Sequence, residues 1–277
     1  MVKILDINDI KQVTGEDEQA VMSQKAVTEL LRKLASNKVI VNFGDSIFGM
    51  SRPPYDVSTE LARLTGATVH NCAFGGCRMS QHSGHYGAFA MCRLADAIVT
   101  GDWSLQEDAL NYDDRPTYAD VPLALLKSLD FTKVDIITIA YGTNDWGSAT
   151  GKLDNPDDTY DVTYFGGALR YSIKRLLEAF PNLQIFILGP TYRCWLTSTG
   201  TFEEDTETKV IAGHLLTDYV ELARNIAKEH LLPFIDNYYE LGINKHNRAH
   251  YFTTTDGTHH VAAGRKLIAA HIAKELF

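Results

Sequence analysis

The chain has 277 residues, of which 45% are hydrophobic, and a formal net charge of −9. This length suits one α/β domain of roughly 200 to 250 residues with a small appendage. The 26 Lys and Arg residues are scattered, so no basic patch for nucleic acid or an anionic membrane surface is expected. No apolar run approaches the ~20 residues that span a bilayer, and the first residues lack the apolar stretch of a signal peptide. The composition therefore predicts a soluble chain with no nucleic-acid partner and no membrane insertion.

Residues 1–37 are expected to form a separate helical appendage. Ser23 is a candidate N-cap, and it precedes apolar residues at helical spacing, namely Val27, Leu30, Leu31 and Leu34. A short helix with one apolar stripe needs a surface to pack on. That surface could be the rest of the chain or a second copy, so a homo-oligomer formed through residues 1–37 stays open.

From residue 38 to residue 277, apolar runs alternate with helical stretches, which is typical of a parallel sheet covered by helices on both faces. Strands are expected at 38–43, 68–73, 134–141, 184–189 and 232–236. Helices are expected at 57–65, 86–99, 118–129, 163–180, 207–230 and 261–276. This order favours a flavodoxin-like five-stranded α/β fold, in which ligands bind beyond the carboxyl ends of the strands. Two segments, 101–116 and 191–206, break the alternation and are expected to be loops that shape substrate access.

The cysteines and histidines give no pattern typical of a disulfide scaffold or a metal site. Four cysteines in a chain of this length are too few for such a scaffold, and buried free thiols are expected at Cys72, Cys77, Cys92 and Cys194. Adjacent histidines such as His259 and His260 cannot easily chelate one ion, and no carboxylate-rich set accompanies His82 and His85. We expect no metal and no other cofactor.

Ser46 is the candidate nucleophile, because Gly44-Asp45-Ser46 follows the first expected strand directly. A serine hydroxyl needs a base to remove its proton, and that base needs a third group to orient it. His259 and Asp256 lie three residues apart near the other end of the chain and could supply both roles. Each fragment alone has a plain alternative, a turn at Ser46 and a helix cap near Asp256. Their combination predicts one active site for acyl transfer.

An oxyanion hole is expected from segments that follow the second and third strands. Gly76 could offer a backbone amide, because without a Cβ the substrate can come close, and Asn144 could offer its side-chain amide. The amide of Ser46 could point into the same space. Trp146, Tyr192 and Trp195 could form a substrate-binding wall at the cleft, although core packing is an equal alternative for each of these aromatic residues.

These residues resemble the four blocks of the SGNH hydrolase superfamily, also called GDSL-like lipases and acylhydrolases. The blocks are Gly44-Asp45-Ser46, Gly76 within N-x-x-x-G-G, Gly142-Thr143-Asn144-Asp145 and Asp256-Gly257-Thr258-His259. The resemblance covers residues 38–277 in order and spacing. It implies a three-layer α/β/α fold, a metal-free Ser-His-Asp mechanism and an oxyanion hole from Ser46, Gly76 and Asn144. The first block reads G-D-S-I-F where lipase members have G-D-S-L.

A second resemblance concerns the stretch V-M-S-Q-K-A-V-T-E-L-L over residues 21–31. It is similar to a short segment of tail-associated and prophage-encoded proteins of gut bacteria. That likeness implies attachment to a particle and a carbohydrate ester as the target. The location stays unknown, and because the sequence shows no signal peptide, the cytoplasm or a phage particle is expected.

The sequence as a whole predicts a serine esterase that cleaves short acyl esters, with O-acetyl groups on carbohydrate as the favoured substrate. No long apolar lid that would cover a fatty chain is visible. Two alternatives stay open: a lysophospholipase or thioesterase that uses the same residues, and a carbohydrate-binding or particle-structural protein that keeps the fold without using the site.

Overall fold

The computed structural model describes residues 10–11, 21–22, 29, 32–33 and 35–277. Within the first part of the chain, β1 (Ile10–Lys11) and β2 (Val21–Met22) pair in parallel. The expected N-cap Ser23 and the apolar stripe from Val27 to Leu34 lie outside the described residues. The appendage and its role in oligomerisation therefore stay predictions.

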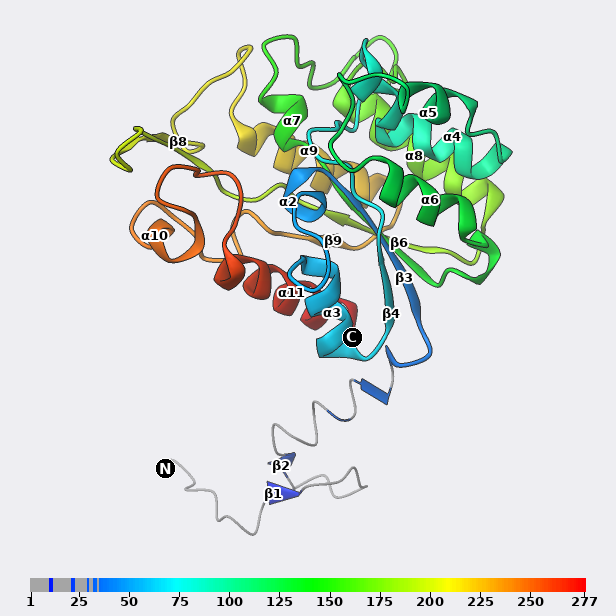
Figure 1. The fold of residues 1–277 in the computed structure, drawn as a ribbon, viewed down its shortest axis with the longest axis horizontal. Coiled ribbons are helices and arrows are strands. Elements are labelled where there is room, and N and C mark those ends of the chain that lie inside the picture. The colour runs from blue at the N-terminus through cyan, green and yellow to red at the C-terminus, as the bar shows by residue number, and fades with distance from the viewer. Residues whose placement is uncertain (1–9, 12–20, 23–28, 30–31, 34) are drawn as a thin grey trace.

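A five-stranded parallel sheet forms the centre of the molecule (Figure 1). Its strand order is β4-β3-β5-β6-β9, and every neighbouring pair is parallel. The strands are β3 (Val39–Gly44), β4 (Thr68–Asn71), β5 (Ile136–Ala140), β6 (Gln184–Leu188) and β9 (Phe234–Ile235). Every residue of the central strand β5 is buried, as expected for a β-branched run covered on both faces. The five expected strands and the α/β fold class are confirmed.

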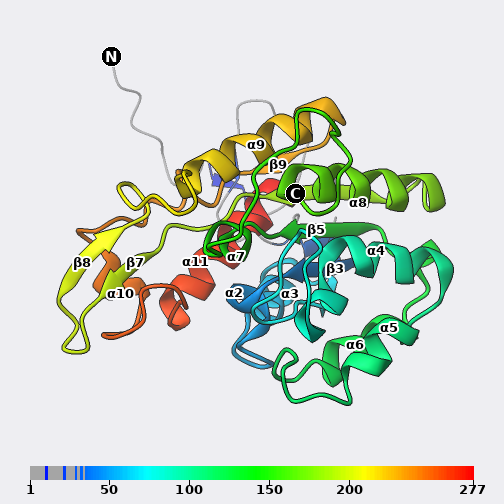
Figure 2. The same ribbon diagram turned by 90° about the horizontal axis from the view of Figure 1, so that it is seen from above.

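Helices cover both faces of this sheet. They are α3 (Val57–Thr65), α4 (Met91–Thr100), α6 (Asp120–Ser128), α8 (Phe165–Ala179), α9 (Leu216–Glu229) and α11 (Ala262–Leu276). The last helix, α11, packs beside α3, whereas α8 packs against α4 and α9. Connections between parallel strands are normally right-handed. In this strand order, that rule puts α3, between β3 and β4, on one face of the sheet and the helices that lead to β5, β6 and β9 on the other. The result is three layers, and Figure 2 shows α8 and α9 side by side in one of the two outer layers.

Two helix predictions need correction. The stretch expected at 86–99 is split, because the 3₁₀ helix η2 (His85–Phe89) ends at Ala90, whose backbone is extended, before α4 begins. The helix expected at 207–230 begins only at Leu216. The residues before it turn back on themselves, since Ile211 and His214 exchange backbone hydrogen bonds around Gly213, which has a φ of 86°.

The two expected loops contain regular structure. Segment 101–116 includes the short helix α5 (Ser104–Ala109). Segment 191–206 forms an antiparallel hairpin of β7 (Cys194–Leu196) and β8 (Phe202–Asp205), which projects from the body of the domain (Figure 1). Further short elements are α2 (Ser46–Gly49), η3 (Phe131–Lys133), α7 (Thr143–Trp146) and α10 (Arg248–Tyr251).

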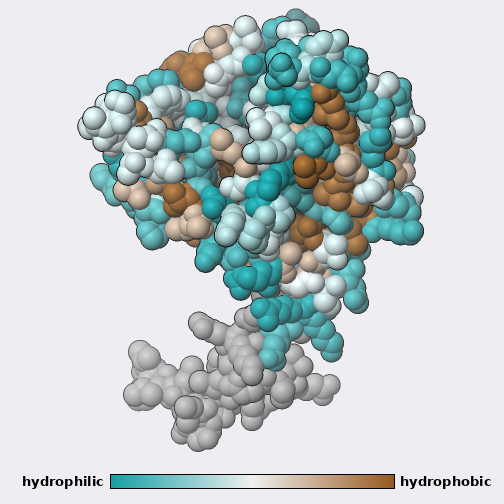
Figure 3. Space-filling view, viewed as in Figure 1, coloured by the Kyte–Doolittle hydropathy of each residue, from teal (hydrophilic) through white to brown (hydrophobic). Residues whose placement is uncertain are grey.

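One face of the described surface is mostly polar (Figure 3), and the cysteines are free thiols. On the face drawn in Figure 3, most of the described surface is hydrophilic, with apolar groups in scattered patches. No helix in the described part of the chain has both the length and the apolar character needed to cross a membrane. All four cysteines are buried and free, as the sequence predicts.

Candidate active site

Four segments that are remote in sequence meet beyond the carboxyl ends of the strands. Helix α2 starts at Ser46 directly after β3, and α7 follows β5 after Gly142. The Gly75-Gly76 turn comes after β4, and the loop that carries Asp256 and His259 precedes α11. Figure 1 shows α2 and α7 at the same edge of the sheet. This is the edge at which parallel α/β folds bind their ligands.

The side chains of Ser46, His259 and Asp256 form a chain of hydrogen bonds. The distance from His259 Nε2 to Ser46 Oγ is 2.8 Å, and that from His259 Nδ1 to Asp256 Oδ2 is 2.6 Å. An ionised carboxylate only accepts hydrogen bonds. Nδ1 of His259 therefore carries a proton and donates a hydrogen bond to Asp256. The lone pair of Nε2 then faces the serine hydroxyl. This arrangement has the geometry that a base-activated nucleophile needs.

Local hydrogen bonds fix the Asp256 carboxylate. Its Oδ1 accepts from the backbone N–H of Thr258 at 2.8 Å and of His259 at 3.2 Å. Burial alone would raise the pKa of Asp256, but the hydrogen bonds from His259 and Thr258 outweigh it and hold the pKa below its usual value. The carboxylate therefore stays ionised at neutral pH and can orient the imidazole.

The neighbouring His260 could not act as the base in place of His259, because its ring is buried and makes no hydrogen bond to Ser46. Its side chain is buried, and its ring lies against Phe252 with the ring centroids 4.6 Å apart. Neither ring nitrogen has a hydrogen-bond partner among the described residues. Burial lowers the pKa of His260 to about 3, with the neighbouring His259 adding to the effect. His260 is thus a neutral core residue.

The three expected oxyanion donors line one cavity with the hydroxyl and the imidazole. Ser46, Gly76, Asn144 and His259 all border this space of about 580 Å³. The Asn144 side-chain amide donates one hydrogen bond to the carbonyl of Cys77 at 2.9 Å, so its second N–H stays available. At Gly76, φ is 76° and a Cβ would lie 2.8 Å from the ring of Tyr86. Only glycine fits that position.

Two buried aspartates hold the surrounding loops. The Asp145 carboxylate accepts hydrogen bonds from the N–H groups of Met79 and Ser80, both at 3.0 Å, and from the Ser80 hydroxyl at 2.6 Å. The Asp45 carboxylate caps α2 by accepting from the N–H of Ile47 at 2.9 Å. These bonds position the turn after Gly76 and the backbone of Ser46.

The predicted aromatic wall is wrong for two of its three members. Trp146 is fully buried, and its indole N–H donates to the carbonyl of His214 at 2.9 Å. Tyr192 is also buried, and its hydroxyl donates to Asp205 at 3.0 Å. Both pack in the core, and neither borders the cavity that contains Ser46. Only Trp195 borders a cavity, one that adjoins the candidate site.

Loop residues that the sequence analysis did not select complete the cavity. Tyr86 comes from η2, and Thr117 and Tyr118 come from the loop before α6. Met50, just after α2, adds an apolar side chain. Turn and loop positions of this kind carry no periodic signal, so a single sequence does not reveal that they face the nucleophile.

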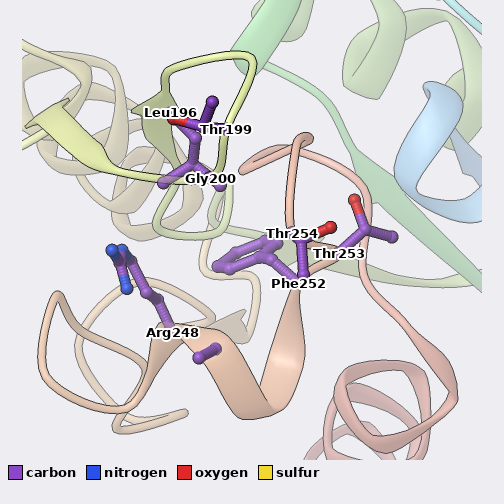
Figure 4. A pocket seen from close by; sticks show the side chains of 8 residues that line it. Leu196, Thr199, Gly200, Arg248, Phe252, Thr253 and Thr254 are labelled. Carbon is purple, nitrogen blue, oxygen red and sulfur yellow. The ribbon is translucent and has the colours of Figure 1, made fainter.

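Other cavities and clusters lie apart from the reacting groups. Figure 4 shows one cavity between the β7–β8 turn and α10, where the side chains of Arg248, Phe252 and Thr254 gather. It does not include Ser46. Within the described residues, one group with metal-ligand atoms close together is Glu240, His271 and Glu275. His271 and Glu275 lie about 14 and 20 Å along the axis of α11 from its first residue, Ala262, and none of the three residues borders the cavity that contains Ser46.

Comparisons with known proteins agree with this fold. The model of the GDSL-like lipase/acylhydrolase family matches residues 42–267. A solved structure of a possible lipase from Chitinophaga pinensis superposes with a TM-score of 0.55 at 17% identity, covering 85% of this chain and 96% of that chain. A protein from Lactobacillus plantarum gives a TM-score of 0.58 at 18% identity, with 86% and 96% covered.

A third solved structure is the salicylyl-acyltransferase SsfX3 from a tetracycline biosynthetic pathway. It has a TM-score of 0.52 at 15% identity, and the match covers 87% of this chain and 55% of that chain. At these identities the likeness shows the fold alone. No curated protein sequence matches this chain.

The α/β fold and the family match define the class of this protein as an acylhydrolase that acts on carboxylic esters. The family model spans most of the domain, so the chain belongs to the GDSL-like lipase/acylhydrolase family. The resemblance to this family noted in the sequence is confirmed.

The buried Asp45 makes a testable contribution to the pH dependence of stability. Burial raises the pKa of Asp45 to about 7, against the opposing effects of the Ile47 N–H and the charge of Arg193. In the unfolded chain an aspartate titrates near pH 3.9, so the native state holds the extra proton between about pH 4 and pH 7. Protonated Asp45 therefore contributes its full stabilisation of the native state below about pH 4, and this contribution is lost as pH rises through 7.

Asp45→Asn keeps an acceptor for Ile47 but cannot ionise. Relative to the parent, this variant should gain up to about 4 kcal/mol of unfolding free energy at pH 8 and little at pH 4. Urea unfolding at both pH values measures the difference. Asp130→Asn is the matched control. The Thr132 hydroxyl lowers the pKa of the exposed Asp130, so this variant should lose unfolding free energy relative to the parent at pH 8 instead of gaining it. Identical pH profiles for Asp45→Asn and the parent would contradict the protonated native state.

Proposed function

We propose that this chain is a serine esterase that removes short acyl groups, O-acetyl above all, from carbohydrate. The observation that carries the proposal is the continuous hydrogen-bond chain from Asp256 through His259 to Ser46, beside a cavity bordered by amide donors. A base, an orienting carboxylate and a hydroxyl in this order are the parts that nucleophilic acyl transfer requires.

In the proposed mechanism, Ser46 Oγ attacks the ester carbonyl while His259 Nε2 takes its proton. The carbonyl oxygen gains negative charge and is stabilised by the amides of Ser46 and Gly76 and by the free N–H of Asn144. The imidazolium then protonates the leaving alcohol, and an acyl-enzyme remains on Ser46. Water attacks this ester with His259 again acting as the base, which releases the acid and restores the hydroxyl. Asp256 stabilises the imidazolium in both halves of the reaction.

The composition of the cavity supports a small acyl group and a sugar. Tyr86, Tyr118 and Thr117 offer aromatic faces and hydroxyl groups close to the nucleophile, and Met50 is the long aliphatic side chain among the residues that border the space. Sugars stack on aromatic faces and hydrogen-bond through their hydroxyls. A fatty chain would instead need a long apolar groove. The resemblance of residues 21–31 to particle-associated proteins points to the same substrate class.

A substrate panel tests this proposal against a lysophospholipase or thioesterase. The panel contains acetylated methyl glycosides and p-nitrophenyl esters from acetate to palmitate, and kcat/KM is measured for each. We expect the value to fall with every extension beyond four carbons, because among the described residues Met50 is the one long aliphatic side chain that borders the cavity and the longer chains find no extended apolar groove there. Ser46→Ala gives the background and should lose nearly all turnover, since the nucleophile is absent. A rising series toward palmitate would overturn the short-acyl assignment, and full activity in Ser46→Ala would overturn the mechanism.

Asn144→Ala tests the oxyanion hole. The substitution removes a donor that acts mainly on the charge of the transition state, so kcat should fall by about 10² to 10³ with KM little changed. Steady-state kinetics on p-nitrophenyl acetate measures both constants, and thermal unfolding checks that the variant folds. A change confined to KM would remove Asn144 from this role.

A further inference from the structure

A cationic cavity adjoins the candidate active site. It has a volume of about 330 Å³, and Gly76 and Asn144 border both this space and the cavity that contains Ser46. Its charged lining residues are Arg78, Arg193 and Lys209. No carboxylate belongs to its lining within the part of the chain that the structure describes. Such a concentration of positive charge is unexpected in a chain with a net charge of −9.

Arg193 is held in place without a direct ion pair to any described residue, although the charges of Asp45 and Asp256 act on it from nearby. Its guanidinium carbon lies 5.0 Å from the ring centroid of Trp195 and 5.7 Å from that of Trp146. One terminal nitrogen donates to the hydroxyl of Thr143 at 3.4 Å, while Nε is buried with no hydrogen-bond partner among the described residues. The two indole rings therefore fix the orientation of a guanidinium that has unused donors.

The other two cations differ in their partners. Lys209 Nζ donates to Glu204 at 2.6 Å, so its charge is balanced within the hairpin. Arg78 forms no ion pair with any residue in the described part of the chain. Two guanidinium groups thus border one partly enclosed space whose lining holds no carboxylate, and neither forms a direct ion pair within the described residues. Charges removed from water are normally paired, so a ligand that supplies the missing anion would fit this cavity.

We propose that this cavity binds a carboxylate of the substrate, so that the ester cleaved at Ser46 is carried by an acidic sugar. The inference rests on the proposed esterase function. An acetyl group fills little of either cavity, which leaves the space around Arg78 and Arg193 to the alcohol part of the ester. Guanidinium groups bind carboxylates through paired N–H···O bonds that fix position as well as charge. Binding there would set the sugar across Gly76 and Asn144, beside the proposed oxyanion donors.

A matched pair of substrates tests the proposal on the full chain. The probes are O-acetylated methyl glucuronoside and the O-acetylated glucuronamide of the same pattern, which differ only in the carboxylate. We expect kcat/KM for acetate release to be about tenfold or more higher for the acid, as befits charge-assisted hydrogen bonds. Arg78→Gln should abolish most of that preference and leave the rate on the amide unchanged. Arg193→Lys keeps the charge but loses the planar guanidinium group, so this variant should reduce the preference for the acid.

Lys228→Gln is the matched control, because it removes one positive charge from an exposed position on α9. It should keep the full preference for the acid. Equal rates on acid and amide in the parent would overturn the carboxylate site while leaving the esterase assignment intact. No acetate release from either sugar, together with no turnover of p-nitrophenyl acetate, would instead refute the proposed function. A preference that survives in both arginine variants would also overturn the site.

Discussion

The contact between the loop before α11 and the start of β7 determines whether a site exists at all. Ser46 and His259 are 213 residues apart. The sheet determines the position of Ser46, which follows β3 directly, but not that of His259. The position of His259 depends on Gly257, whose carbonyl accepts a hydrogen bond from the N–H of Cys194 at 2.9 Å. A side chain at Gly257 would overlap the backbone and the sulfur of Cys194. This close approach brings the imidazole to the edge where β3 ends.

Rigidity around that contact comes from several short-range interactions. Phe252 and His260 form an isolated antiparallel bridge that closes the loop from both sides. Inside it, the Asp256 carboxylate binds two backbone N–H groups as well as the imidazole. The loop thus supplies its own positioning groups, and a preorganised base needs little rearrangement when an ester binds. Asp145 provides the equivalent support for the turn after Gly76.

Charge is distributed unevenly between the surface and the site. The chain is acidic overall, yet the space beside the oxyanion donors carries guanidinium groups and no carboxylate among its described lining residues. Asp45, the buried acid of the Gly-Asp-Ser turn, is only about half ionised near pH 7, because burial raises its pKa to about 7. A negative substrate would therefore meet less repulsion than a fully ionised Asp45 would cause. If the substrate is an acylated sugar, as proposed, such an arrangement would favour selection among sugars by charge in addition to shape.

Sequence reasoning located the sheet well because its strands are short apolar runs bounded by turn residues. It also brought Ser46, Asp256 and His259 together as candidates, since each follows from the chemistry of acyl transfer. It misplaced the start of α9, because the reversal between Ile211 and His214 depends on a tertiary fit that no local pattern records. It likewise assigned Trp146 to the cleft, since a position next to a motif does not reveal which way a side chain points. Arg78 lacked any signal, because it lies in a loop with no periodicity.

Covalent labelling with a fluorophosphonate probe tests the central claim directly, because the reaction requires a serine that a neighbouring base has activated. The parent, His259→Ala and Ser46→Ala are treated with the probe, and the modified peptide is identified by mass spectrometry. We expect the parent to be labelled at Ser46 alone, the His259→Ala variant to react about a hundredfold or more slowly, and Ser46→Ala not to react. Labelling of another serine, or equal rates in the parent and His259→Ala, would contradict an active site built on the Asp256, His259 and Ser46 hydrogen bonds.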